Sequence, residues 1–89
     1  MYIQKLSNQC ERTIKRDIKR GFDVKVLHDL MNALASGNSL HPKYKDHALK
    51  GDMRGYRECH IKPDWLLVYR IEGEYIVFHK TGTHADMFG

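Results

Sequence analysis

The chain has few of the residues that stabilise small secreted proteins, and it lacks the apolar runs that cross membranes. Only two cysteines, Cys10 and Cys59, and two prolines occur among its 89 residues, and no C-x-x-C spacing is present. This excludes a disulfide scaffold, and we expect both thiols to be reduced. No apolar run approaches bilayer length, and the first residues form no apolar signal core. The sequence therefore predicts a cytoplasmic protein with no membrane partner.

Positive charge is what the chain has in moderate excess. It contains 15 Lys and Arg against 11 Asp and Glu, a net charge of +4. Seven of the basic residues precede residue 26, so the N-terminal part carries much of the positive field. Such a field favours RNA, DNA or an acidic protein partner, or is simply a solvated surface. With 42% hydrophobic residues, the length predicts one domain, residues 1–89, with a thin core.

The first third of the chain predicts a strand and two helices. Residues 2–6 alternate as a short strand, and Asn8 with Glu11 three residues later indicates a helix start. That helix runs to Arg20 with a narrow apolar stripe, and Gly21 ends it. Basic residues cover most of the rest of its circumference, among them Arg12, Lys15, Arg16 and Lys19.

A second helix and a β-rich part follow. Asp23 caps a helix with apolar residues at i, i+3, i+4 and i+7 spacing, which Gly37 ends. Residues 38–55 form a long polar loop, of a length that is more often functional than idle. Three strands follow, at residues 56–61, 65–71 and 75–80, with a tight turn at 72–74. The order β-α-α-β-β-β predicts an α+β fold in which a helical hairpin packs on a mainly antiparallel sheet.

Three histidines with polar neighbours, His47, His60 and His84, are candidates for acid–base chemistry, because imidazole both takes and gives a proton near neutral pH. Alternation along the strand places Glu58 and His60 on one face, where the carboxylate would orient the ring or merely form an exposed polar pair. His28 and His79 are expected to be, respectively, solvent-facing and structural.

Asp64 and Trp65 follow the turn after His60. In one interpretation Asp64 is a turn residue and Trp65 anchors the core. In the other, the carboxylate of Asp64 orients His60 and the indole of Trp65 stacks on a base. No spacing matches a zinc motif, and the basic neighbours Lys45, Lys50 and Arg57 disfavour a dication. We therefore expect no metal and no cofactor.

The segments 44–51 (YKDHALKG), 55–65 (GYRECHIKPDW) and 81–84 (TGTH), with Phe88, closely resemble the YafQ-like branch of the RelE/ParE toxins. The resemblance spans residues 40–89 at motif level, and the β-α-α leader agrees with it. It implies a RelE-like fold and the toxin of a type II toxin–antitoxin system. The implied activity is a metal-independent endoribonuclease, an mRNA interferase, that cuts mRNA in the ribosomal A site.

The resemblance also implies partners and site residues. The partners are a DinJ-like antitoxin, mRNA and the 70S ribosome through the 16S rRNA of its A site, with operator DNA bound only through the antitoxin complex. The positions that match the family's active site are His47, His60, Asp64, His84 and Phe88, with Trp65 beside them. Lys80 stands where the family often has Arg; it keeps the charge but loses the bidentate fork.

These residues lead to a mechanistic hypothesis. His60 or His47 is the base, with Asp64 fixing its ring, and His84 is the acid, although these two labels can be exchanged. Lys80 stabilises charge on the phosphoryl group. Phe88 and Trp65 hold a flanking nucleotide, and RNA contacts are expected from Lys45, Lys50 and Arg57. The basic first helix is then expected to bind ribosomal RNA through four residues: Arg12, Lys15, Arg16 and Lys19.

Two alternatives stay open at this point. One is a ParE-like gyrase poison, against which the histidine cluster argues. The other is a non-catalytic antitoxin partner that acts only as a co-repressor.

Overall fold

The structure is a computed structural model that describes residues 1–88. The elements in chain order are β1 (Ile3–Leu6), α1 (Asn8–Lys19), α2 (Val24–Ala35), η1 (Pro42–Tyr44), β2 (His47–Ala48), η2 (Gly51–Met53), β3 (Arg57–Lys62), β4 (Trp65–Glu72), β5 (Tyr75–Gly82) and α3 (His84–Phe88). The predicted order of one strand, two helices and three strands is confirmed. The sequence pattern missed η1, β2, η2 and α3, because elements of two to five residues are too short to show a period.

The two long helices begin at side-chain caps. The carboxylate of Asp23 accepts the N–H of Lys25 at 2.9 Å, as the sequence predicted for the start of α2. The cap predicted for α1 was wrong by one residue: Ser7 rather than Asn8 precedes the helix, and its hydroxyl oxygen accepts the N–H of Cys10 at 3.0 Å. The Ser7 hydroxyl also donates to the carbonyl of His79, so this cap ties the start of α1 to β5.

One five-stranded sheet forms the centre of the fold, with the strand order β1-β5-β4-β3-β2. Strands β2 to β5 pair antiparallel, whereas β1 pairs parallel with β5. The prediction of a mainly antiparallel sheet is therefore confirmed. The tight turn between β4 and β5 contains Gly73 at φ +60°, a conformation that glycine adopts at little cost.

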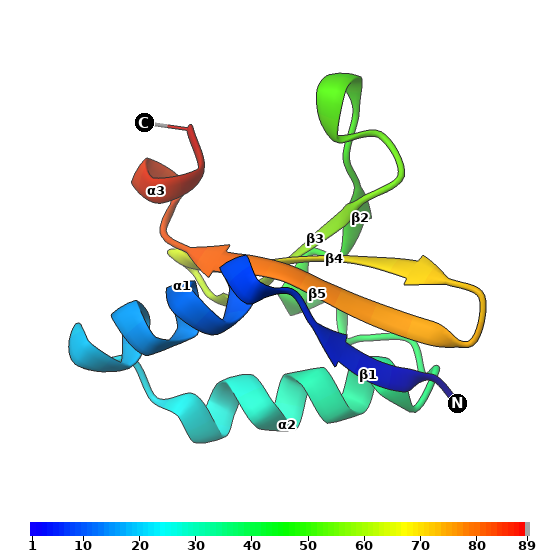
Figure 1. Ribbon diagram of the computed structural model, residues 1–89, viewed down its shortest axis with the longest axis horizontal. Coiled ribbons are helices and arrows are strands. Elements are labelled where there is room, and N and C mark those ends of the chain that lie inside the picture. Colours follow the sequence, from blue (N-terminus) through cyan, green and yellow to red (C-terminus); the bar gives the residue numbers. More distant parts are fainter. Residues whose placement is uncertain (89) are drawn as a thin grey trace.

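Both long helices lie against the same face of the sheet (Figure 1). The core between them contains, among others, Ile14 of α1, Leu27 of α2, and Leu67 and Phe78 of the sheet. The opposite face carries no long helix; α3 and the loop that holds η2 rise from it at two separate places (Figure 1). We call this second side of the sheet the open face.

A bulge in β5 sorts its side chains between the two faces. Phe78 packs in the core and Thr81 bonds to α1, so both point to the helix side although they are three residues apart. The register between β4 and β5 shifts at this point: Val68 faces Lys80, but Tyr69 faces Phe78. Because one extra residue is accommodated here, His79 and Lys80 both turn toward the open face.

A buried carboxylate ties α1 to the sheet. Asp17 is fully buried, and it accepts the indole N–H of Trp65 at 2.9 Å and the hydroxyl of Thr81 at 2.7 Å. Arg16 and Arg20 lie 3.1 and 3.5 Å from its other oxygen. The charge is tolerated in the interior because two cations and two neutral donors surround it.

Among residues 1–88, no helix is long and apolar enough to cross a membrane.

We predict that Asp17→Ala destabilises the fold by about 3 kcal/mol, because it leaves two buried donors and two arginines without their acceptor. Urea unfolding of wild type and variant measures this difference. The control is Asp29→Ala, which removes only the exposed ion pair with Lys25 and should change stability by less than about 0.5 kcal/mol. Equal stability of Asp17→Ala and wild type would contradict the assigned role of this carboxylate.

Candidate active site

The predicted catalytic residues lie in two rows across the open face. In the first row His47 pairs with Glu58, Glu58 with Val68, and Val68 with Lys80. In the second row His60 pairs with Leu66 and Leu66 with Gly82, two residues before His84. Neighbouring strands are about 4.8 Å apart and alternate residues of one strand about 6.7 Å apart. The two rows are therefore close together, while His47 and Lys80, at the two ends of the first row, are about 14 Å apart. Strand pairing therefore brings together residues spread over half of the chain.

His84 and Asp64 form the best-defined pair of the site. One carboxylate oxygen of Asp64 accepts both the Nδ1–H of His84 at 2.6 Å and its backbone N–H at 2.8 Å. These two bonds lower the pKa of Asp64, the backbone bond contributing most. With Nδ1 fixed as the donor, Nε2 of His84 is the atom that exchanges a proton with a ligand. The expectation that Asp64 orients His60 was wrong, because its carboxylate is used by the histidine at the start of α3.

His47 is held by a carbonyl and faces a buried carboxylate. Its Nδ1 lies 2.6 Å from the carbonyl oxygen of Lys45 and must carry the hydrogen, since a carbonyl only accepts. Its Nε2 lies 3.8 Å from the carboxylate of Glu58, a residue that is 5% exposed. Glu58 was predicted to serve His60 on its own strand or to be exposed. In the structure the carboxylate of Glu58 faces His47 instead. The reason is that β2 pairs with β3 at this position, and the sequence pattern did not reveal β2.

His60 lies next to His84, with the two ring centroids 5.5 Å apart in an edge-to-face arrangement. It is half-buried, and within residues 1–88 its ring has no hydrogen-bond partner. Of the three histidines, it is the one whose two ring nitrogens are both unoccupied.

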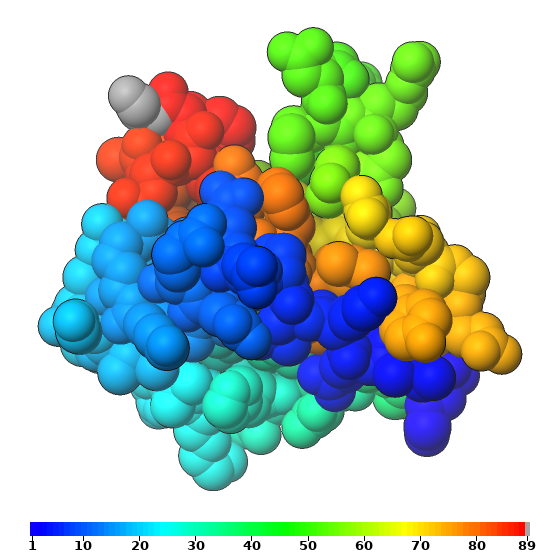
Figure 2. Space-filling view, in the orientation of Figure 1, coloured from blue at the N-terminus to red at the C-terminus, as the bar shows by residue number. Residues whose placement is uncertain are grey.

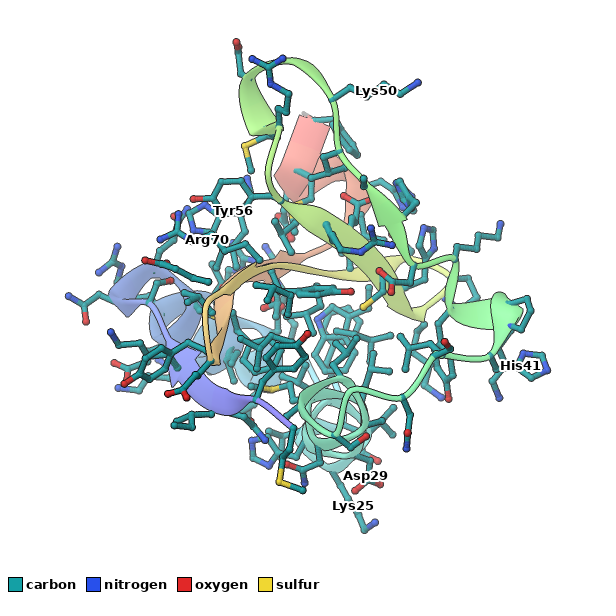
Figure 3. The ribbon with its side chains drawn as sticks, turned by 90° about the vertical axis from the view of Figure 1, so that its right-hand side faces the viewer. Lys25, Asp29, His41, Lys50, Tyr56 and Arg70 are labelled. Atoms are coloured by element: carbon teal, nitrogen blue, oxygen red, sulfur yellow. The ribbon has the colours of Figure 1, made fainter. Side chains whose placement is uncertain are left out.

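Further polar residues of the open face lie beyond Lys80. His79 tilts against the ring of Tyr56, and burial, with the charges of Lys80 and Arg70, lowers its pKa. It is thus kept neutral, which agrees with the structural role predicted for it. The Tyr56 hydroxyl accepts a hydrogen bond from Arg70 at 2.9 Å, and Figure 3 shows the two side chains together. The sequence pattern did not mark Arg70, because it reads as an ordinary polar position in an alternating strand.

The short helix α3 is fixed to α1 by an ionic contact. Asp86 accepts from Arg20 at 2.6 and 3.1 Å and lies 3.3 Å from Arg16. Asp86 also accepts the N–H of Thr83, and these bonds hold the pKa of its carboxyl far below its usual range. Gly82 permits this packing, since a Cβ there would lie 2.8 Å from the Cβ of Asp86. The helix that carries His84 is therefore positioned by side chains on the far side of the sheet.

Trp65 is part of the core and cannot stack on a base from the open face. It is 1% exposed, its ring stacks on Phe22 at 4.6 Å, and its N–H is bound by Asp17. The prediction that Trp65 holds a nucleotide was wrong, because it starts β4 on the helix side of the sheet. Phe88, in contrast, is 73% exposed, and its ring lies 6.3 Å from that of His84.

Two of the basic residues expected to bind RNA are engaged within the protein. Arg16 donates to the carbonyl of Thr81 in addition to its ion pairs. Arg57 points to the helix side of β3 and donates to Asp46, which also accepts the hydroxyl of Tyr69. These guanidinium groups bind buried or half-buried carboxylates of the protein, and their contact with RNA stays a prediction. The other five basic residues expected to bind RNA are exposed: Arg12, Lys15, Lys19, Lys45 and Lys50.

No group of three His, Cys, Asp or Glu side chains in the described part of the chain is arranged to hold a metal ion. Cys10 and Cys59 are free and buried, and burial raises the pKa of each thiol to about 12. They are therefore neutral packing residues.

The chain was compared with known proteins. Residues 2–89 match the sequence model of a family described as the bacterial toxin of type II toxin–antitoxin system, YafQ. The mRNA interferase toxin YafQ of Escherichia coli K12 is 40% identical over 84 residues, which cover 93% of this chain and 91% of that protein.

Two solved structures are similar over almost their whole length. YafQ in the DinJ–YafQ complex of E. coli has a TM-score of 0.91 and 37% identity, and each chain is covered completely. A metal-bound toxin from Helicobacter pylori has a TM-score of 0.91 and 40% identity, covering 99% of this chain and all of that one. The α+β fold expected from the sequence is confirmed by these structures.

We predict that Asp86→Asn lowers stability by about 1 kcal/mol near neutral pH, or about 4–8 °C in Tm, because it weakens the bonds from Arg20. The folded state lowers the pKa of Asp86, so its contribution is complete above the ordinary value of 3.8 and is lost as the pH falls below it. Thermal unfolding near pH 7 and near pH 2 should show a difference that shrinks in acid. Asp52→Asn, at an exposed position in η2, is the control, and an equal loss in both variants would contradict the assignment.

Proposed function

The chain belongs to the YafQ family of bacterial type II toxins, and from this we propose that it is an mRNA interferase, the endoribonuclease toxin of a toxin–antitoxin pair. We further propose that it acts on mRNA in the A site of the ribosome, without a metal ion. The observation that carries the catalytic part is the Asp64–His84 pair beside the free ring of His60.

RNA cleavage by this route needs a base and an acid on the same phosphodiester. The base removes the proton of the 2′-hydroxyl, whose oxygen then attacks the adjacent phosphorus. The bond from phosphorus to the 5′-oxygen breaks, and the acid gives that oxygen a proton. The products are a 2′,3′-cyclic phosphate and a 5′-hydroxyl. The attacking and leaving oxygens share one phosphorus, so the two catalytic groups have to be neighbours.

We assign the acid to His84 and the base to His60. The carboxylate of Asp64 accepts Nδ1–H of His84 and stabilises the imidazolium, which donates its second proton from Nε2. His60 has no hydrogen-bond partner among the described residues, so its ring can accept the 2′-hydroxyl proton. His47, the alternative base, forms with Glu58 the neighbouring pair in the adjacent row.

Two further residues suit the charge and the stacking that the reaction requires. The register of β5 supports a role for Lys80, whose side chain is on the open face, in stabilising the charge that develops on the phosphoryl oxygens. The exposed ring of Phe88 lies beside His84 and offers a surface for a base.

The proposed partners follow from the same relatives. Since E. coli YafQ is seen in complex with DinJ, we propose a DinJ-like antitoxin for this chain. Operator DNA would be bound only through that complex. The basic surface of α1, formed by Arg12, Lys15 and Lys19, would meet 16S rRNA while the open face meets mRNA.

We predict that His84→Ala abolishes growth arrest and lowers mRNA cleavage by at least about 100-fold, as is usual for loss of a general acid. Primer extension in a translating extract measures the cuts, and circular dichroism checks that the variant is folded. His28→Ala, on the exposed side of α2, should behave as wild type.

The same assay separates the competing functions. Cuts within codons support a ribonuclease that acts in the ribosomal A site. Gyrase-dependent DNA damage without RNA cuts would indicate a gyrase poison, and neither effect would indicate a co-repressor. A folded His84→Ala protein with full toxicity would refute the assignment of the acid.

We predict a steep salt dependence of ribosome binding, because Lys and Arg that contact phosphates release counterions. A triple variant, Arg12→Gln, Lys15→Gln and Lys19→Gln, should flatten the slope of log affinity against log salt by about two to three. Sedimentation with 70S ribosomes measures the slope, and Lys5→Gln with Lys25→Gln serves as the charge control. Salt-independent binding of the wild type would mean that α1 is only a solvated surface.

A further inference from the structure

With Trp65 in the core, the structure offers another place for a nucleotide beside the catalytic histidines. A cavity of about 480 Å³ borders His60 and His84 at the end of the sheet where the β3–β4 turn meets η1. Its volume lies in the range of small-molecule sites, about 300–1,000 Å³. The cavity is therefore large enough for one nucleotide, and it is continuous with the proposed catalytic pair.

The lining of this cavity combines an apolar wall with a cationic rim. Tyr44, Ile61 and Pro63 supply the apolar and aromatic surface, and Tyr44 is half-buried, so its ring is held in place. Lys43, Lys45 and Lys62 line the rim, and none of the lining residues is acidic. An aromatic wall with three ammonium groups fits a nucleobase and its phosphate better than it fits a neutral ligand.

The backbone of η1 is built to hold this wall. The imidazole of His41 accepts the N–H of Lys43 at 3.0 Å and so caps η1. Lys45, which ends η1, is the one residue other than glycine in the described chain with a positive φ, at +49°. This conformation is unfavourable for an L residue and tends to occur at functional sites. The carbonyl of Lys45 also accepts Nδ1–H of His47, so the cavity wall and the catalytic face share one segment.

We propose that this cavity, which we call the lysine pocket, binds one nucleotide that flanks the scissile phosphate of the RNA. The base lies against Tyr44 and the apolar wall, and the phosphate is bound by Lys43, Lys45 and Lys62. The lysine pocket thereby takes the role that Trp65 cannot fill, and its contacts select among codons. The inference rests on the proposed ribonuclease function.

The binding test uses 2′-O-methyl dinucleotides with each of the four bases, which cannot be cleaved because the nucleophile is blocked. Their binding to ¹⁵N-labelled protein should shift the amide resonances of residues 43–45 and 60–62. The double variant Lys43→Ala, Lys62→Ala should raise the dissociation constant about tenfold. Tyr44→Leu should reduce the differences between bases. Lys5→Ala removes an exposed lysine from β1, at the opposite edge of the sheet from β3 and β2, and should leave binding unchanged.

Cleavage in the translating extract distinguishes failure of the lysine pocket from failure of the function. In the double variant we expect a weaker apparent affinity for programmed ribosomes and a changed distribution of cuts among codons, with cleavage retained at saturation. If the wild type makes no cuts, the ribonuclease function fails whatever the dinucleotides do. If the wild type cuts and the double variant keeps its affinity, codon pattern and dinucleotide binding, the lysine pocket is refuted. If only the antitoxin shifts the pocket resonances, its occupant is a protein and the inference is overturned.

Discussion

The buried carboxylate of Asp17 is the contact on which the arrangement of this domain depends. It joins α1 to β4 through Trp65 and to β5 through Thr81. The arginines that neutralise it, Arg16 and Arg20, extend to Asp86 and so hold α3 on the other side of the sheet end. Side chains on the helix side of the sheet thus position the helix α3, which carries His84 of the open face. Figure 2 shows α3, in red, and the η2 loop, in green, as separate projections on either side of a hollow above the sheet.

Sheet register supplies the rest of the site. The three histidines come from three different elements, and pairing across β2, β3, β4 and β5 places them within two adjacent rows. The bulge in β5 adds Lys80 to the same face, whereas strict alternation from Phe78 would turn it to the helix side, and it also turns Thr81 inward to Asp17. One irregularity therefore serves both the site and the core.

The sequence predicts the long elements well because their periodicity spans many residues. Through the family resemblance, the sequence also predicts that His47, His60, Asp64 and His84 share one site. It does not predict which carboxylate serves which histidine. Asp64 was assigned to His60, but the turn directs it to His84, and Glu58 reaches His47 only because a two-residue strand pairs there. Likewise Trp65, Arg16 and Arg57 are residue types that often bind RNA, but in this fold they donate hydrogen bonds to buried or half-buried carboxylates.

The assignment of His84 as the acid is tested most directly by changing the leaving group. An mRNA with sulfur in place of the 5′-oxygen at the cut site needs no proton on departure, because a thiolate is a far better leaving group than an alkoxide. Single-turnover cleavage on programmed ribosomes should then be restored in His84→Ala to within about tenfold of wild type, while His60→Ala stays inactive. Failure of the sulfur substrate to rescue His84→Ala, or rescue of His60→Ala instead, would contradict the account.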